Sequence, residues 1–132
     1  LFQREMSGLA AVRRTPEDLK ALDVALSAEA VEKDPAAFRA LDWSFFQTLA
    51  RASHNIAFTF LLNSVRAVHE RWGALYFGSP GTIATTPRFP ALIGRAISKG
   101  DAARAAALTV RLLNYSNPLL MEGLMKYMRG NP

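Results

Sequence analysis

The sequence predicts an all-α protein, an antiparallel bundle of about six helices, and three observations support this fold class. Ala occurs 22 times and Leu 17 times among the 132 residues, whereas Val and Ile together occur only 10 times. Ala and Leu lose little conformational freedom in a helix, and a scarcity of β-branched residues argues against strands. The length suits one domain with a sizeable core. Apolar residues also recur at helical spacing between start and stop signals.

The first two predicted helices meet at a turn with a strong helix-start signal. Residues 1–14 have a helical pattern that already includes Leu1, so we expect the chain to begin within a truncated first helix. Thr15 is suited to an N-cap and Pro16 to the first helical position, and two acidic residues follow in the first turn. The core face of this second helix is predicted to contain Leu19, Leu22 and Leu26.

A third helix is predicted to begin at Pro35, after residues 32–35 end the second one. Apolar residues then repeat at helical spacing, which predicts a buried face made of Phe38, Leu41, Phe45, Leu49 and Ala52. The tripeptide 53–55 is predicted to be a short corner that leads into the next helix.

One long helix is predicted over residues 56–77, followed by a loop at 78–86 that contains Gly and Pro. The apolar stripe of this helix is predicted to contain Leu61, Val65, Val68, Trp72 and Tyr76. Thr86-Pro87 then resembles a helix start. The inward-facing residues of that next helix are predicted to be Phe89, Leu92, Ile93, Ala96 and Ile97.

The last two helices are predicted to meet at a tight junction, Lys99-Gly100-Asp101, with a cation at the end of one helix and a cap for the next. Helices joined so closely fold back antiparallel. The final stretch, 101–128, is predicted to be helical with a kink or restart at Asn117-Pro118. Its end has an apolar stripe formed by Met121, Leu124, Met125 and Met128.

The charge is unevenly distributed along the chain. The net charge is +5, and residues 1–42 sum to −2 whereas residues 43–132 sum to +7. A positive second part is suited to an anionic ligand or partner, although singly spaced Arg residues are more often simply solvated. No apolar run is long enough for a membrane span and no leader pattern opens the sequence, so we expect a cytoplasmic protein without membrane contact.

Enzyme chemistry has no positive support in the sequence. There is no cysteine, and the two histidines, His54 and His69, are too far apart to hold a metal on one helix face. No phosphate-binding loop and no nucleophile motif is present. Instead, polar residues interrupt otherwise apolar stripes at Asp42, Asn63 and Ser116. Each of them alone is typical of a satisfied core or cap residue, but together they suggest a pocket inside the bundle.

The chain resembles the effector domain of the FadR subfamily of GntR-type transcription regulators, and within it the fatty-acid-responsive members. The resemblance rests on residues 37–46 (AFRALDWSFF), 49–55 (LARASHN), 62–63 (LN) and 71–77 (RWGALYF), with Pro80 following. It covers nearly the whole chain, residues 1–132, and implies one effector domain. The winged helix-turn-helix that precedes this domain in the family is not in the sequence. We therefore expect contact with DNA only through that missing domain.

The resemblance also implies that the family's metal site is absent. Three of the four positions where most of the family binds a metal through Asp and His are occupied here by Phe46, Pro90 and Leu112, and only Asp42 remains. Side chains of Phe, Pro and Leu donate no electron pair to a metal, so we expect no metal and no cofactor. Acyl-CoA-responsive members of the family also lack the histidines.

Ser116 matches a serine that the fatty-acid-responsive regulators use in sensing their ligand. The sequence departs from the family at the neighbouring tyrosine, glycine and tryptophan, where it has Leu112, Leu113 and Leu120. The bulkier Leu113 narrows the expected pocket, and Pro118 is expected to shift the helix.

These inferences combine into one functional hypothesis, a ligand-sensing domain that binds a fatty acid or acyl-CoA between its helices and acts as a homodimer. Ligand binding would favour one packing of the bundle and so set the spacing of two DNA-reading heads. The alternatives are a small organic-acid sensor, with Arg66, Arg111 or an arginine upstream of Leu1 as the cation, and a ligand-free dimerisation module. The predicted ligand-binding residues are Asp42, Trp43, Phe46, Asn63, Arg66, Phe89, Pro90, Leu112, Leu113 and Ser116.

Overall fold

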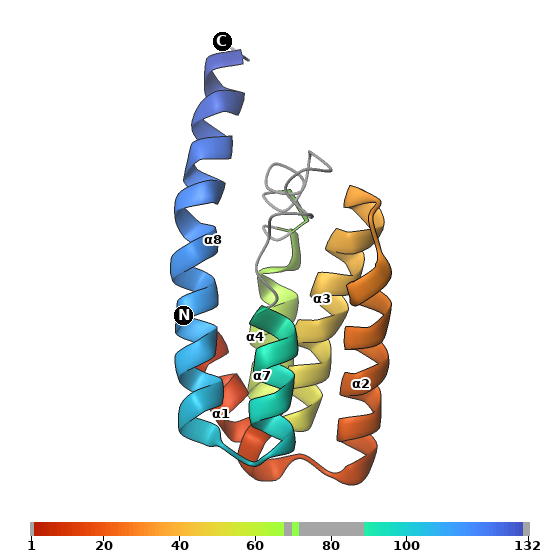
Figure 1. Cartoon of the computed structure of the whole chain (residues 1–132). Coiled ribbons are helices and arrows are strands. Elements are labelled where there is room, and N and C mark those ends of the chain that lie inside the picture. The colour runs from red at the N-terminus through yellow and green to blue at the C-terminus, as the bar shows by residue number, and fades with distance from the viewer. Residues whose placement is uncertain (1, 68–69, 72–88, 131–132) are drawn as a thin grey trace.

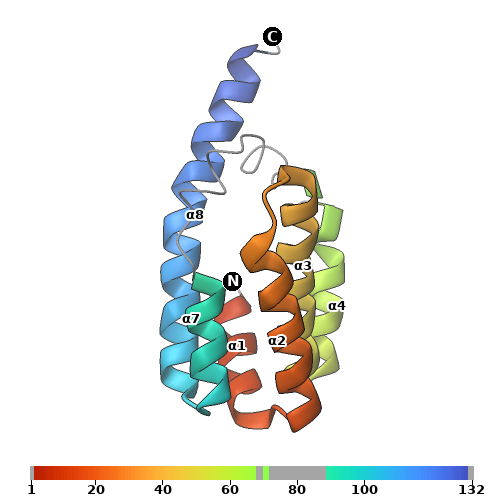
Figure 2. The ribbon, with the colours of Figure 1, turned by 45° about the vertical axis from the view of Figure 1, so that its right-hand side comes forward.

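The computed structural model describes residues 2–67, 70–71 and 89–130, and it describes their side chains except at 116–120, 122–124, 126 and 127. The described residues form helices and no strand, which confirms the predicted all-α bundle. Successive helices run up and down along one common direction (Figures 1 and 2). Labelled as in Figure 1, they are α1 (Gln3–Arg13), α2 (Pro16–Val31), α3 (Pro35–Ala52), α4 (Ile56–Ser64), α7 (Phe89–Ser98) and α8 (Ala102–Gly130).

The start of α2 has the predicted capping residues. The Thr15 side chain accepts a hydrogen bond from the Asp18 backbone N–H at 3.2 Å, and the Asp18 carboxylate accepts one from the Thr15 N–H at 2.9 Å. This reciprocal capping box satisfies two backbone donors that the helix itself leaves without partners. The start of α3 is also as predicted, because the Asp34 carboxylate caps it through the Ala37 N–H and Pro35 occupies the first turn.

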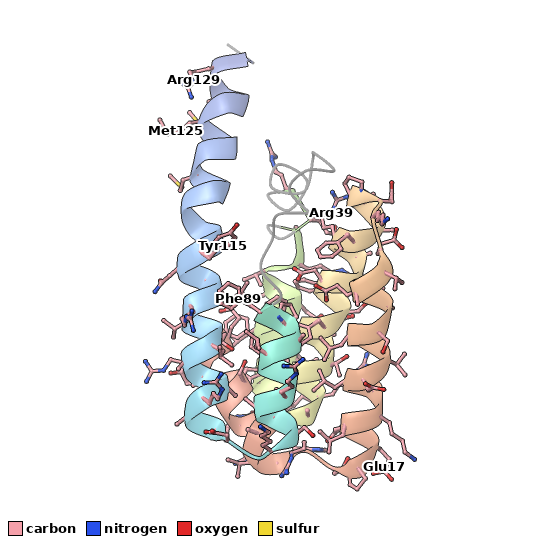
Figure 3. All side chains as sticks on the ribbon, viewed as in Figure 1. Glu17, Arg39, Phe89, Tyr115, Met125 and Arg129 are labelled. Carbon is pink, nitrogen blue, oxygen red and sulfur yellow. The ribbon has the colours of Figure 1, made fainter. Side chains whose placement is uncertain are left out.

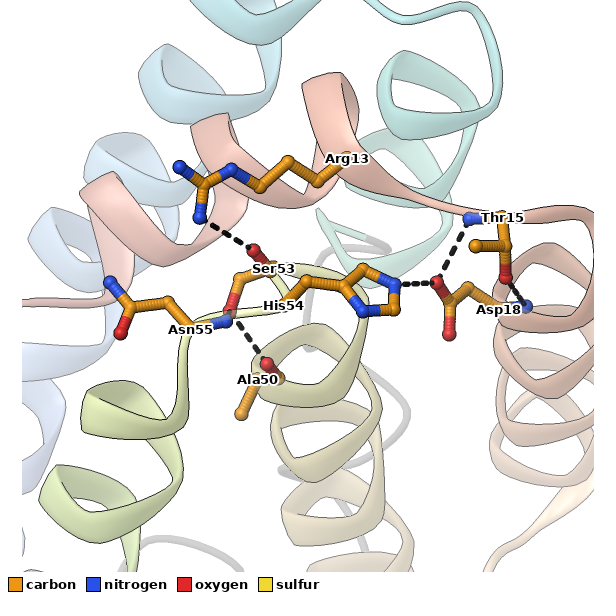
Figure 4. Close-up of polar contacts among 7 residues, drawn as sticks. All are labelled: Arg13, Thr15, Asp18, Ala50, Ser53, His54 and Asn55. Atoms are coloured by element: carbon orange, nitrogen blue, oxygen red, sulfur yellow. Dashed lines mark hydrogen bonds and ion pairs between the residues drawn. The ribbon is translucent and has the colours of Figure 1, made fainter.

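The corner between α3 and α4 is tied to the start of α2 by a histidine (Figure 4). His54 Nε2 lies 2.6 Å from Asp18 Oδ2, which joins residues 36 positions apart. His54 itself has a φ of 51°, in the left-handed region that a non-glycine residue rarely adopts. Arg13 supports the same corner by donating to the Ser53 carbonyl at 3.4 Å. The corner predicted at residues 53–55 is therefore confirmed and has a specific tertiary anchor.

The short helix α1 lies at the centre of the described core. Its residues Met6, Ala10 and Ala11 are fully buried, and it contacts α3, α7 and α8. Small residues allow α1 and α8 to approach each other closely, since a side chain added at Gly8 would already touch α8. The buried hydroxyls of Ser7 and Thr109 are hydrogen-bonded to each other at 2.8 Å, and Thr109 also donates to the Ala105 carbonyl.

The predicted inward faces of the other helices are largely confirmed. Leu22 of α2 is buried, and Leu19 and Leu26 pack partly buried against the same cluster. On α3 and α7 the residues that were predicted to face inward and are buried are Phe38, Phe45, Leu49, Ala52, Phe89, Ile93, Ala96 and Ile97. No helix in the described part of the chain is long and apolar enough to span a membrane.

The long helix predicted over 56–77 is wrong at its centre, because α4 ends at Ser64 and Val65 adopts a turn conformation. This interruption changes which residues face the core. Phe58 and Leu62 are buried, whereas Leu61, which was assigned to the buried stripe, is 43% exposed. The predicted apolar stripe assumed one regular helix through residue 65, so the spacing of the later residues was used to place Leu61. The other predicted positions, Val68, Trp72 and Tyr76, lie outside the described residues, as do the loop at 78–86 and the helix start at 86–87.

The junction between α7 and α8 is as predicted, with Gly100 at a φ of 72° and Asp101 accepting from the Arg104 N–H at 3.0 Å. The helix that follows differs from expectation in one respect. The backbone of α8 is one uninterrupted helix through Pro118, so the predicted restart is wrong. Figures 1 and 2 show its C-terminal part extending past the ends of the other labelled helices. On this extension the predicted stripe residues Met121, Met125 and Met128 are more than half exposed rather than packed.

Candidate functional site

An aromatic cluster occupies the part of the bundle where the sequence predicts a ligand site. Trp43, Phe46, Phe89 and Leu112 belong to or pack against one hydrophobic cluster, although they come from α3, α7 and α8. Trp43 and Phe89 are buried, whereas Phe46 and Leu112 are partly exposed to solvent. The edge of the Phe46 ring meets the ring of Phe45, with centroids 5.4 Å apart. Four of the predicted residues thus belong to the same hydrophobic core, although α3 has no substantial packing against α7 or α8.

Asp42 is the acidic group of this region. Its side chain is half-buried on α3, one helical turn from both Phe38 and Phe46. Burial raises the pKa of the Asp42 carboxyl to about 7, because removal from water disfavours the charged form. No hydrogen bond or ion pair joins it to any residue in the described part of the chain. A carboxyl group that can be neutral near pH 7 can donate as well as accept a hydrogen bond, which suits a ligand-contacting role.

Phe89 and Pro90 form the beginning of α7 and are both buried. The Phe89 ring is tilted against Tyr115 of α8, with ring centroids 6.1 Å apart (Figure 3). The guanidinium of Arg111 lies over the Phe89 ring, with its carbon 5.8 Å from the ring centroid. This distance is within the range of a cation–π interaction. The arrangement places an exposed cation directly beside an apolar group of the predicted site.

Sequence reasoning missed Tyr115. Leu108, Leu112 and Tyr115 follow one another at spacings of four and three, which puts them on one face of α8. Leu108 is buried and the other two pack against the core, so this spacing was the signal that could have identified Tyr115. Tyr115 brings a phenol group close to the site, and its hydroxyl can hydrogen-bond to a ligand.

The structure separates Asn63 from the predicted site. Asn63 was predicted to line the interior of the bundle, but it is exposed on α4, about 100° around the helix from the buried Leu62. The physical reason is the packing of α4 on α3, which buries Phe58 and Leu62 and leaves Asn63 outside the contact face. Asn63 therefore lies on the surface rather than among the core residues.

Arg66 is also exposed, but it stays connected to the cluster. Its guanidinium lies 6.0 Å from the centroid of the Trp43 ring, and its Nε donates to Glu70 Oε1 at 3.2 Å. Of the two cations considered from the sequence, Arg66 thus has an acidic neighbour, whereas no acidic side chain within the described ranges is paired with Arg111. Leu113 is half-buried, and the side chain of Ser116 lies outside the description.

The donor atoms of the region do not form a metal site within the part of the chain that the structure describes. No group of three or more His, Asp or Glu side chains comes together there. The absence of a bound metal in the protein stays a prediction, which elemental analysis can test.

Comparison with known proteins identifies relatives of this domain. A family model described as the FCD domain matches residues 1–115. The chain is similar to fatty acid metabolism regulator proteins of Yersinia pestis (strain Pestoides F) and Yersinia pseudotuberculosis (serotype O:1b, strain IP 31758). Identity is 37% over 70 residues in each case, which is 53% of this chain and 28% of the relative. The match therefore spans little more than a quarter of each relative's length.

Proposed function

Because this chain belongs to the FCD domain family, the C-terminal effector domains of GntR-family regulators, we propose that it senses a fatty acid or acyl-CoA between α3, α7 and α8 without a metal. Its family makes it a ligand-sensing regulatory domain rather than an enzyme. The relatives' name concerns fatty acid metabolism, which supports a ligand with an acyl chain.

The observation that carries the proposal is the composition of the site. Phe46 and Leu112 are the partly exposed apolar side chains that an acyl chain would contact, with the buried rings of Trp43 and Phe89 in the same core, and burial of each methylene would contribute roughly 0.8 kcal/mol. Arg111 offers a guanidinium that can fork onto a carboxylate or phosphate at the polar end of the ligand. Asp42, with its raised pKa, would hydrogen-bond to the ligand's polar group without introducing a full negative charge.

The proposed mechanism is a conformational linkage. The bundle is proposed to have two alternative packings, one of which binds the ligand more tightly. A ligand held between α3, α7 and α8 then shifts the equilibrium toward that packing, by a free energy set by the ratio of its affinities for the two. In a homodimeric regulator this packing would set the spacing of two DNA-binding domains, which would come from a preceding part of the full-length protein. This chain would contact DNA only through such a domain.

The proposal is tested by thermal unfolding with free fatty acids and acyl-CoAs of about eight to about eighteen carbons, a range over which roughly 0.8 kcal/mol per methylene accumulates. The expected result is a melting temperature that rises with chain length and then levels off. Stabilisation that is independent of chain length would instead support a small organic-acid sensor. If no acyl ligand raises the melting temperature, the fatty-acid proposal fails, and a ligand-free dimerisation module becomes the better interpretation of the domain's function.

One pair of variants and one single variant locate the ligand. Arg111→Gln should weaken the stabilisation by a free acid or CoA ester but not by a methyl ester, because only the first two carry an anion for the guanidinium. Arg104→Gln is the matched control, two helical turns earlier on the exposed side of α8. Ser116→Leu should lower the affinity for all of these ligands, because the larger side chain fills space in the proposed site. If this variant binds the ligands as tightly as the wild type does, the ligand lies elsewhere.

A further inference from the structure

Three of the four methionines of the chain are gathered on one short stretch of α8. The fourth, Met6, belongs to the core, and its side chain is fully buried. Met121, Met125 and Met128 lie near the end of α8, and their exposed fractions are 57%, 55% and 63%. Because they follow one another at spacings of four and three, the three lie on one face of the helix.

This face of α8 points away from the bundle. At about 100° per residue, Met121 and Met125 continue the side of α8 on which Ala107 and Asn114 are exposed, and the buried Ala105 lies on the opposite side. Figure 3 shows the side chain of Met125 on the side of α8 remote from the other helices. The three thioethers are therefore open to solvent.

An exposed thioether is a site of oxidation. Its sulfur is soft and nucleophilic, and oxidation converts the flexible apolar side chain into a polar sulfoxide. The chain has no cysteine, so no thiol of its own competes for an oxidant. The reactive sulfur of the folded chain is thus concentrated on the outer face of α8, while the sulfur of Met6 is shielded by the core.

The part of α8 that carries these methionines has little to hold it as a helix. Tyr115 is the last residue of α8 that packs against the core among the side chains that the structure describes. Figures 1 and 2 show the helix continuing past the ends of the other labelled helices. Residues 116–130 are close to the length of roughly 12–15 residues below which isolated helices are marginal in water, and they include Pro118 and Gly123, two poor helix formers. A sulfoxide oxygen that competes for backbone N–H groups can therefore unfold this segment without disturbing the core.

We propose that Met121, Met125 and Met128 form an oxidation site at which hydrogen peroxide converts the end of α8 from an apolar helix into a polar, unfolded segment. At each residue the sulfur lone pair attacks one peroxide oxygen and the O–O bond breaks. The transferred oxygen gives its proton to the departing hydroxide, which leaves as water. The sulfur is oxidised by two electrons and the peroxide is reduced, and methionine sulfoxide reductases reverse the change. The site does not depend on which ligand the domain binds.

The first test is peptide mass spectrometry of the folded chain after treatment with hydrogen peroxide. Each of the three exposed methionines should gain one oxygen at least about tenfold faster than Met6, because the core shields the Met6 sulfur. In concentrated urea, which unfolds the chain, all four should react at similar rates, so this control separates burial from neighbouring sequence. Equal rates for all four methionines in the folded chain would overturn the proposal.

The second test measures the consequence for α8 by circular dichroism. Full oxidation of the three exposed methionines should remove the helix signal of residues 116–130 and leave the thermal unfolding of the core nearly unchanged. The matched control is the triple variant Met121→Leu, Met125→Leu and Met128→Leu, which keeps the apolar face but should lose no helix in the same peroxide. Methionine sulfoxide reductases should restore the helix signal of the oxidised wild type. An unchanged signal after full oxidation, or an equal loss in the leucine variant, would overturn the proposal, whether or not the ligand experiments above succeed.

Discussion

Replacement of Asp42 by asparagine should stabilise the protein, and the gain should grow with pH. The Asp42 carboxyl has an ordinary pKa of 3.8 in the unfolded chain and a pKa of about 7 in the fold, because burial disfavours its charged form. That difference corresponds to roughly 4 kcal/mol of unfolding free energy. Asparagine has nearly the same shape but no charge to bury, so it removes this cost.

The sign of the pH dependence follows from the proton balance. Below about pH 4 the carboxyl is protonated in both states and Asp42→Asn should change little. Between that pH and about 7 the unfolded chain has lost the proton while the folded protein keeps it, so the wild type loses stability steadily. Above about pH 7 the difference is constant, with the variant more stable by roughly 4 kcal/mol.

Urea denaturation of wild type and variant at several values between about pH 4 and about pH 8 measures this difference directly. Asp23→Asn is the control, because it makes the same chemical change at a carboxylate that is exposed on α2. If Asp42→Asn is less stable than wild type at pH 8, the carboxylate has a stabilising partner and its pKa is not raised by burial. That result would also remove Asp42 from the proposed ligand site.

Two further predictions follow from the described structure, and two from the sequence. Asp18→Asn should lower the unfolding free energy by about 1 kcal/mol, through loss of the capping box and the His54 contact. Burial raises the pKa of the Asp18 carboxyl, but hydrogen bonds from Thr15 and His54 and the charge of His54 outweigh the effect of burial and keep the pKa below its usual value. The destabilisation by Asp18→Asn should therefore vanish as the pH falls through that lowered pKa, which urea denaturation at several pH values can measure. Gly100→Ala should cost about 1 kcal/mol in thermal unfolding, because alanine is strained at a φ of 72°, whereas Gly130→Ala should change little. Elemental analysis should find no stoichiometric zinc, nickel or manganese, and about one metal per chain would contradict the expected loss of the family's site. Fluorescence anisotropy should show only weak, salt-sensitive binding of this chain to duplex DNA, and tight sequence-selective binding at physiological salt would refute it.

The helix boundaries that could be predicted from the sequence are those with local causes. Thr15 and Asp18 form their capping box within four residues, and Gly100 adopts its positive φ within one turn, so neighbouring residues suffice to predict both. The end of α4 at Ser64 has no such local signal, because no Gly or Pro marks it and the apolar pattern continues. Leu61 was consequently assigned to the wrong face.

The candidate site depends on contacts between distant helices, and it could be predicted only in part. Trp43, Phe46, Phe89 and Leu112 do share one cluster, and the family resemblance was needed to connect them. Asn63 was placed in the interior because it follows two leucines, but the sequence alone does not specify which side of α4 faces α3. Tyr115 packs against the core through its ring, although its hydroxyl makes it look like a surface residue in the sequence.

The hydrogen bond between Ser7 and Thr109 has a consequence for the order of folding. These residues are 102 positions apart, and the α1 helix that carries Ser7 is the centre of the described core. During synthesis α1 leaves the ribosome before α8 and has to wait for α8, its main partner, before its small, weakly apolar surface can be covered. Such long-range closure is entropically costly and slows folding relative to a bundle of sequential neighbours. Early termination before α8 should therefore leave a chain that cannot close its core and is a substrate for chaperones or proteases.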